Sequence, residues 1–268
     1  MAKIKTSSPQ RVSTGIEGLD TILKGGLPQN RLYLVEGHPG TGKTTMGLHF
    51  LREGEKQGEK GLYITVSESR EELVAVGKSH GWDLENLEIK DLSVISDEIN
   101  EDSHYTIFHP VEVELDETTK EIVREVERIN PSRVVFDSLA DLRMLTSDSL
   151  RFRRQIFALK QFFHKRSCTV MLLDDYAEGA YKQLDSVAHG VISLEYAPAE
   201  YGKQRHNLRV VKMRGVNFQS GTHDFNIETG GIVVFPRLTT PEKTDGFKPG
   251  VLESSSPELE SLLGGLDY

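Results

Sequence analysis

A short glycine-rich segment between an apolar run and an amphipathic run is the feature that most limits how this chain can fold. Residues 37–44 read Gly-His-Pro-Gly-Thr-Gly-Lys-Thr and fit the pattern G-x-x-x-x-G-K-[ST]. The apolar run 31–36 predicts a buried strand before it, and the run from 43 to about 56 predicts a helix that Gly58 ends. In this strand–loop–helix context the pattern binds phosphate groups. The two flanking elements disfavour the alternative, a glycine turn without a ligand.

The residue types in this phosphate loop (37–44) suit the parts of a nucleotide. Gly37, Gly40 and Gly42 let the backbone turn tightly, so that successive N–H groups point at phosphate oxygens. We expect Lys43 to reach the β- and γ-phosphates, and Thr44 to offer its hydroxyl to Mg²⁺. The expected nucleotide-binding residues are Gly37, His38, Pro39, Gly40, Thr41, Gly42, Lys43, Thr44 and Thr45.

Acidic residues follow three further predicted strands. Asp137 ends an apolar strand at the expected loop edge and either holds the water shell of Mg²⁺ or caps a helix or turn. Glu68 lies just beyond another strand and either orients the water that attacks the γ-phosphate or is a first-turn acid of the next helix. Asp174 and Asp175 end a third strand and either sense the γ-phosphate or solvate the turn.

Two cations, Lys212 and Arg214, lie two positions apart at the end of a predicted strand and therefore point to the same face. One interpretation is that they meet the γ-phosphate bound by a neighbouring subunit, as an arginine finger does. The other is a solvated sheet edge whose charge discourages aggregation. The residues alone favour the second interpretation.

Strands and helices alternate along most of the chain. Apolar strands are expected at 31–36, 61–66, 133–137 and 168–174. Helices are expected over 43–56, from a capping box at 69–72 to Ser79, from Asp116 to the stop at Pro131, and over about 149–166. Short runs without long helices follow at 187–195, 206–214, 222–227 and 231–235. The sequence therefore predicts an α/β fold with a mostly parallel central sheet flanked by helices and antiparallel strands in the C-terminal part.

Composition limits the class of protein. The 268 residues carry 32 Lys and Arg against 41 Asp and Glu, a net charge of −9, which argues against a protein that coats nucleic acid. The single cysteine excludes a disulfide framework and suits a reducing cytosol. No run reaches the ~20 apolar residues of a membrane span, and the first residues lack the apolar segment of a signal peptide. We therefore expect a soluble, cytoplasmic protein without a membrane or nucleic-acid partner.

The end of the chain repeats a signal from its beginning. Residues 14–27 and 256–266 both run from a small polar residue through an acidic, leucine-bearing helical turn to Gly-Gly-Leu. The first copy leads into the strand before the phosphate loop, so the second predicts the start of another unit; a short helix with a glycine stop is the alternative. We expect a flexible tail at 1–12, a domain at 13–236, a linker at 237–255 and the start of a truncated second domain at 256–268.

Taken together, these segments resemble the KaiC-like ATPases of the RecA superfamily. The likeness extends over nearly the whole chain and rests on 13–20, 25–28, 37–44, 81–84, 133–137 and 212–215. It implies a RecA-like P-loop NTPase fold and a hexameric ring that holds ATP and Mg²⁺ at each subunit interface. Lys43, Thr44 and Asp137 would come from one subunit, and Lys212 and Arg214 from the next.

The resemblance also has consequences for activity. Members of the family carry two adjacent glutamates where this chain has Ser67 and Glu68, which implies hydrolysis that is slow or depends on Glu68 alone. KaiB-like or other signalling proteins are the implied partners. The phosphoacceptors of the family's Ser/Thr autokinase belong to the second domain, so kinase activity is expected only of a longer parent protein. Two alternatives stay open: a nucleotide-gated scaffold with negligible turnover, and a RadA- or DnaB-like DNA-dependent ATPase, which the acidic segment 138–148 disfavours.

Overall fold

The computed structural model describes residues 10–92, 110–146, 148–176, 184–197, 205–238, 251–252 and 266–267. The chain divides into two compact units, Met1–Arg237 and Leu238–Tyr268. Most of the expected tail, linker and second repeat copy lies outside the described residues.

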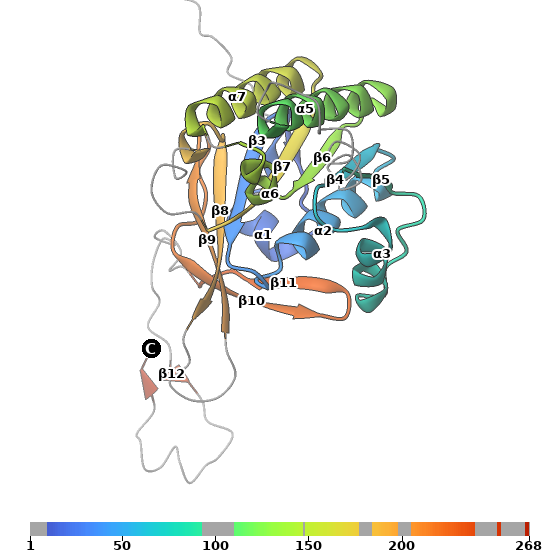
Figure 1. The fold of residues 1–268 in the computed structure, drawn as a ribbon. Helices are drawn as coiled ribbons and strands as arrows, with labels where there is room; N and C mark the ends of the chain where they lie inside the picture. Colours follow the sequence, from blue (N-terminus) through green and yellow to red (C-terminus); the bar gives the residue numbers. More distant parts are fainter. Residues whose placement is uncertain are drawn as a thin grey trace, which may run out of the picture. The chain divides into compact units, whose positions relative to one another are not determined.

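Within the described part, the first unit contains a nine-stranded sheet in the order β11-β10-β9-β8-β3-β7-β6-β4-β5 (Figure 1). Its strands are β3 (Leu32–Gly37), β4 (Gly61–Thr65), β5 (Glu88–Asp91), β6 (Arg133–Asp137), β7 (Thr169–Asp175), β8 (Gly190–Ala197), β9 (Arg205–Met213), β10 (Thr222–Glu228) and β11 (Gly231–Phe235). The strands from β8 to β5 in this order run parallel, and those from β8 to β11 pair antiparallel. This arrangement confirms the predicted fold class.

The change of direction comes one strand later than the sequence pattern indicates. β8 was expected among the antiparallel strands, but it is parallel to β3 on one side and antiparallel to β9 on the other. Val191, Ile192 and Leu194 are all completely buried. Burial on both faces is typical of a strand inside a parallel sheet, and it explains why β8 belongs to the parallel part.

Helices cover both faces of the sheet (Figure 1). One apolar core includes residues of α1 (Glu17–Ile22), α2 (Lys43–Lys56) and α3 (Arg70–Ser79), and the other includes residues of α5 (Pro110–Ile129), α6 (Leu139–Met144) and α7 (Ser149–Lys165). α5 begins at Pro110, before the expected Asp116, because proline fits the first turn of a helix. Of the helices described, none joins enough length with enough apolarity to span a membrane.

Side chains along each strand alternate between these two layers. On β7, Met171 and Leu173 belong to the core that contains α2, whereas Val170 and Leu172 belong to the core that contains α7. This alternation decides which residues at the strand ends face the phosphate loop.

A small sheet precedes the phosphate loop, formed by β1 (Arg11–Val12) and β2 (Leu27–Pro28). The Arg11 guanidinium donates to the carbonyl oxygens of Leu23 (2.7 Å) and Gly26 (2.8 Å). The folded part therefore includes Arg11 and Val12, which the sequence pattern assigned to the tail. In the second unit, β12 (Val251–Leu252) pairs antiparallel with β13 (Leu266–Asp267).

Candidate functional site

The phosphate loop connects β3 to α2 through glycines in unusual conformations. Gly40 has a φ of +80° and Gly42 a φ of +96°, in the left-handed region that favours glycine. A Cβ on Gly42 would lie 2.7 Å from Ile227 Cδ1, and one on Gly37 would lie 2.5 Å from Thr41 Oγ1. The loop is therefore wrapped as tightly as its sequence pattern predicts.

Lys43 is the first residue of α2, and only 9% of it is exposed. Its ammonium group donates to the carbonyl oxygens of Gly37 (2.8 Å) and His38 (3.1 Å). It also forms an ion pair of 2.9 Å with Asp175 Oδ1, at the end of β7. The lysine side chain is thus folded back along the inside of its own loop.

Asp137 ends β6 next to the start of α2, and 9% of it is exposed. Its Oδ2 atom accepts hydrogen bonds from Thr44 Oγ1 (2.9 Å) and from the hydroxyl of Tyr63 (2.5 Å). Burial raises the pKa of the Asp137 carboxyl, while the bonds from Tyr63 and Thr44 and the charge of Lys43 oppose that rise. The structure therefore brings Thr44 and Asp137 together, as the sequence predicts, and adds Tyr63 to them.

A hydroxyl and a carboxylate in contact suit Mg²⁺, which binds through one or two protein oxygens, water and the phosphates of its substrate. Among the described residues, no group of three His, Cys, Asp or Glu side chains is arranged to hold a metal ion alone. The helix-capping role considered for Asp137 belongs to its neighbour instead, because the Ser138 side chain accepts from the Asp141 N–H at the start of α6. The pair Thr44–Asp137 therefore fits an ion that arrives with a nucleotide.

Glu68 follows β4, close enough to Asp137 for their charges to interact. Burial, and then the negative charge of Asp137, raises the pKa of Glu68. Its backbone N–H donates to Thr65 Oγ1 (2.9 Å), and its buried Oε2 has no hydrogen-bond partner among the described residues. Glu68 precedes the N-cap residue Ser69, and the acids in the first turn of α3 are Glu71 and Glu72, so Glu68 is not the first-turn acid of that helix.

The neighbours Asp174 and Asp175 point to opposite faces, because they are successive residues of a strand. Asp175 contacts Lys43 in the phosphate loop. Asp174 is 3% exposed and forms an ion pair with Arg143 of α6, and burial raises its pKa to about 6. The expectation that both acids either sense the γ-phosphate or solvate the turn is therefore wrong for Asp174, which is a buried partner of Arg143.

Lys212 and Arg214 contact successive carbonyl groups at the turn before β8. Lys212 donates to the carbonyl of Asp185, and Arg214 donates to that of Ser186 at 2.6 Å. The two cations therefore do lie side by side, as their spacing predicts.

The register of the sheet separates these cations from the phosphate loop of their own chain. Met213, between the two cations, is paired with Gly190 at the start of β8, and Gly190 is paired with Tyr33 near the start of β3. The phosphate loop follows the opposite end of β3, at Gly37. Lys212 and Arg214 thus lie level with the start of β3, at the opposite ends of the strands from the phosphate loop. They do not join the site of the same chain.

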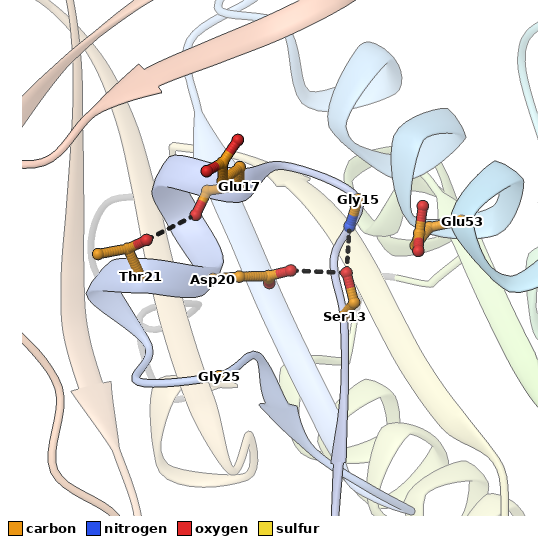
Figure 2. A pocket seen from close by; sticks show the side chains of 7 residues that line it. All are labelled: Ser13, Gly15, Glu17, Asp20, Thr21, Gly25 and Glu53. Atoms are coloured by element: carbon orange, nitrogen blue, oxygen red, sulfur yellow. Dashed lines mark hydrogen bonds between the residues drawn. The ribbon is translucent and has the colours of Figure 1, made fainter.

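A hollow of about 440 Å³ lies beside α1 (Figure 2) and is lined by Ser13, Gly15, Glu17, Asp20, Thr21, Gly25 and Glu53. Asp20 accepts from the hydroxyls of Ser13 (2.6 Å) and Thr14 (2.7 Å), and Ser13 Oγ accepts from the Gly15 N–H (3.0 Å). These bonds fix the turn that begins α1. Glu53 lies ten residues after Lys43 on α2, about 15 Å along the helix axis, so the hollow is separate from the phosphate loop.

Comparison with known proteins agrees with this geometry. A family model described as "ATPase: KaiC" matches residues 12–239. The circadian clock oscillator protein KaiC of Prochlorococcus marinus is 30% identical over 266 residues, which cover 96% of this chain and 52% of that protein. A UPF0273 protein of Thermotoga maritima is 31% identical over 239 residues, which cover 85% of this chain and 96% of that protein.

A solved structure shows the same fold. The crystal structure of a KaiC-like protein from Pyrococcus horikoshii has a TM-score of 0.71 and 26% identity, and covers 85% of this chain and 100% of that chain. The present chain spans about half the length of the KaiC relatives and nearly the whole length of the UPF0273 relatives. With the family model matched over most of its length, the chain belongs to the KaiC-like ATPase family.

Proposed function

We propose that this chain binds ATP with Mg²⁺ at the phosphate loop and hydrolyses it slowly. The observation that carries the proposal is the 2.9 Å contact between Thr44 Oγ1 and Asp137 Oδ2 beside Lys43, the first residue of α2. It joins a hydroxyl, a carboxylate and a cation at a helix N-terminus, the combination that binds a nucleotide triphosphate with its metal ion.

Each residue has a role in this proposal. Lys43 would hold the β- and γ-phosphates, and Thr44 and Asp137 would hold Mg²⁺, which neutralises charge on the phosphate oxygens when it is bound. Glu68 would accept a proton from the attacking water. The buried Oε2 of Glu68, which has no hydrogen-bond partner in the part of the chain that the structure describes, and the raised pKa of Glu68 support this role.

The cations Lys212 and Arg214 would complete the site of a neighbouring subunit. Because they lie at the far end of the sheet from their own phosphate loop, only a second copy could bring them to a bound γ-phosphate. A hexameric ring, the assembly implied by the family, would meet this requirement at each interface. Family membership is likewise what supports KaiB-like signalling partners and an autokinase in a longer parent protein.

The second unit is proposed to start another domain of the same kind. Leu252 lies opposite Leu266 in the β12–β13 pair, as Val12 lies opposite Leu27 in the β1–β2 pair. In both copies the second residue of these pairs is the Leu of a Gly-Gly-Leu segment. This shared register supports the start of a second domain after the one at 13–236. It includes Val251 and Leu252, which the sequence pattern assigned to the linker at 237–255, so the second domain would begin before residue 256.

A nucleotide-gated scaffold with negligible turnover is the second candidate function. The hydroxyl of Ser67 donates to Asp141 Oδ2 (3.0 Å), and a serine cannot replace the first acid that the family pattern has there. A DNA-dependent ATPase would need basic residues in segment 138–148 to contact DNA. The one basic residue there, Arg143, is paired with Asp174 and mostly buried.

Measurements of ATP binding and phosphate release separate the ATPase from the scaffold. An ATPase predicts that Lys43→Ala abolishes ATP binding and that Glu68→Gln keeps binding but loses at least tenfold in phosphate release. Glu71→Gln, which changes an exposed acid in the first turn of α3, is the matched control and should keep wild-type rates. Binding with the same negligible release in wild type and Glu68→Gln would favour the scaffold. Binding that survives Lys43→Ala unchanged would refute the proposed site.

A further inference from the structure

The last two residues of β7 and the residue that follows the strand each have a defined partner. Asp174 is paired with Arg143 of α6, and Asp175 is paired with Lys43. Tyr176 stacks on His38 of the loop, with ring centroids 5.5 Å apart and planes 18° apart. This segment thus contacts the phosphate loop twice: Asp175 pairs with Lys43 of the loop, and the ring of Tyr176 stacks on that of His38.

The contacts of Lys43 use all of its donors. A lysine ammonium group has three N–H donors and no acceptor. In this structure they are matched by the carbonyls of Gly37 and His38 and by Asp175 Oδ1, at 2.8, 3.1 and 2.9 Å. A phosphate oxygen that binds Lys43 must therefore displace one of these partners.

The partner that a phosphate displaces most readily is Asp175. The two carbonyls belong to the backbone of the loop itself, whereas the Asp175 side chain is 46% exposed and regains water when it is released. Pairing of Asp175 with Gly37 across β7 and β3 keeps the carboxylate near the loop after displacement. A bound nucleotide would then lie close to an unneutralised negative charge.

Resting on the proposed function, we propose that Asp175 is a positioning residue that competes with the phosphates for Lys43 and weakens binding of the triphosphate more than that of the diphosphate. Repulsion between like charges grows with the charge of the ligand. ATP carries one more negative charge than ADP, so the same carboxylate disfavours ATP more strongly. Asp175 thereby sets how readily the site exchanges its product for new substrate.

Equilibrium titration of the full chain with Mg²⁺ and either a fluorescent non-hydrolysable ATP analogue or a fluorescent ADP tests this competition. Asp175→Asn is expected to bind the ATP analogue on the order of tenfold more tightly than wild type, with a smaller gain for ADP. Asp175→Glu keeps the charge and should restore weak binding. Glu195→Gln removes an acid that is paired with Arg209 at the same edge of the sheet, and it should change neither affinity more than about twofold.

The possible outcomes separate this inference from the proposed function. Equal affinities in wild type and Asp175→Asn, or weaker binding in the variant, would overturn the competition and leave the nucleotide site intact. If no nucleotide binds in a manner that depends on Lys43, the proposed function itself fails. Asp175→Ser, checked for folding by circular dichroism, serves as a second neutral variant and must change the two affinities in the same direction as Asp175→Asn.

Discussion

The hydroxyl of Tyr63 donates a 2.5 Å hydrogen bond to Asp137 Oδ2, the oxygen that also accepts from Thr44. Tyr63 is completely buried in β4, the strand next to β6. The phenol and the threonine together fix the orientation of this buried carboxylate. Tyr63 therefore orients the carboxylate of the proposed metal-binding pair, Thr44 and Asp137.

Loss of this hydroxyl should weaken Mg²⁺ binding. Groups that orient a metal ligand contribute about 10- to 100-fold to metal affinity or activity, so Tyr63→Phe is expected to raise the Mg²⁺ concentration needed for half-maximal phosphate release by about that factor. Tyr33→Phe is the matched control, since Tyr33 is equally buried and its hydroxyl donates to the carbonyl of Pro28 instead. The same Mg²⁺ dependence in both variants would show that Tyr63 has only a packing role.

Subunits with complementary defects should restore phosphate release when they are mixed. Lys43→Ala removes the phosphate-binding cation and Arg214→Ala removes the proposed cation from the neighbour, so each variant alone should lose phosphate release. A random equal mixture pairs an intact loop with an intact cation at about a quarter of the interfaces, and activity should recover to about that fraction. Arg209→Ala, on the same strand and with its side chain 48% exposed, should keep wild-type activity. A mixture as inactive as its components would contradict a site shared between subunits.

The buried guanidinium of Arg133 should be important for stability. It is completely buried, pairs with Glu59, and donates to the carbonyls of Ser13 (2.7 Å) and Phe50 (2.9 Å). Arg133→Met leaves these acceptors without a donor and should lower the free energy of unfolding by about 3 kcal/mol in urea titrations.

Arg128→Met provides the control for Arg133. Arg128 is 59% exposed and has partners on the surface, so its loss should leave the free energy of unfolding nearly unchanged. Similar losses in both variants would mean that burial of Arg133 adds nothing.

His49 predicts a loss of stability in acid. Its Nε2 atom accepts from the Ile232 N–H (2.9 Å), and its ring meets Trp82 edge-on. Burial, followed by the charge of Arg52, lowers the pKa of His49 to about 4. Since this folded-state pKa lies below the unfolded value of about 6.5, the stabilisation is complete above pH 6.5 and is lost as the pH falls toward 4.

The contribution of His49 can be isolated by comparison with His49→Gln, which keeps an acceptor but does not titrate. From pH 7 to pH 4.5 the wild type should lose roughly 2 to 3 kcal/mol more free energy of unfolding than the variant. Urea titrations at the two pH values measure this difference. Equal losses of free energy of unfolding in the wild type and in His49→Gln would show that other groups control unfolding in acid.

Local sequence patterns predicted the parts of the site that lie close together along the chain. The glycines of the phosphate loop, the start of α2 at Lys43 and the capping box of Ser69 and Glu72 all have the expected form. Each depends on residues a few positions apart, so spacing alone specifies the geometry. The position of Asp137 at the sheet edge that carries the phosphate loop was also predicted, because the carboxyl ends of parallel strands meet at one edge of a sheet; its hydrogen bond with Thr44 comes from the structure.

Other residues depend on contacts that no local pattern encodes. Tyr63 and Arg133 lie in strands that the sequence predicted without assigning a partner to either side chain, and each finds its partner 74 residues away in the sequence. A polar tip in a buried strand requires a partner, and this was the available signal for Tyr63. The different roles of Asp174 and Asp175 follow from the pleat of β7, which the sequence predicted as a strand without assigning its faces.

The antiparallel course of β9 makes the two ends of each sheet unlike: one carries the phosphate loop, and the other carries Lys212 and Arg214. Contacts between such unlike ends are head-to-tail, and they close into a ring only if the rotation between copies divides a full turn; otherwise they extend into an open filament. Catalysis that needs both ends would then depend on protein concentration. Specific activity should fall on dilution even when ATP is saturating.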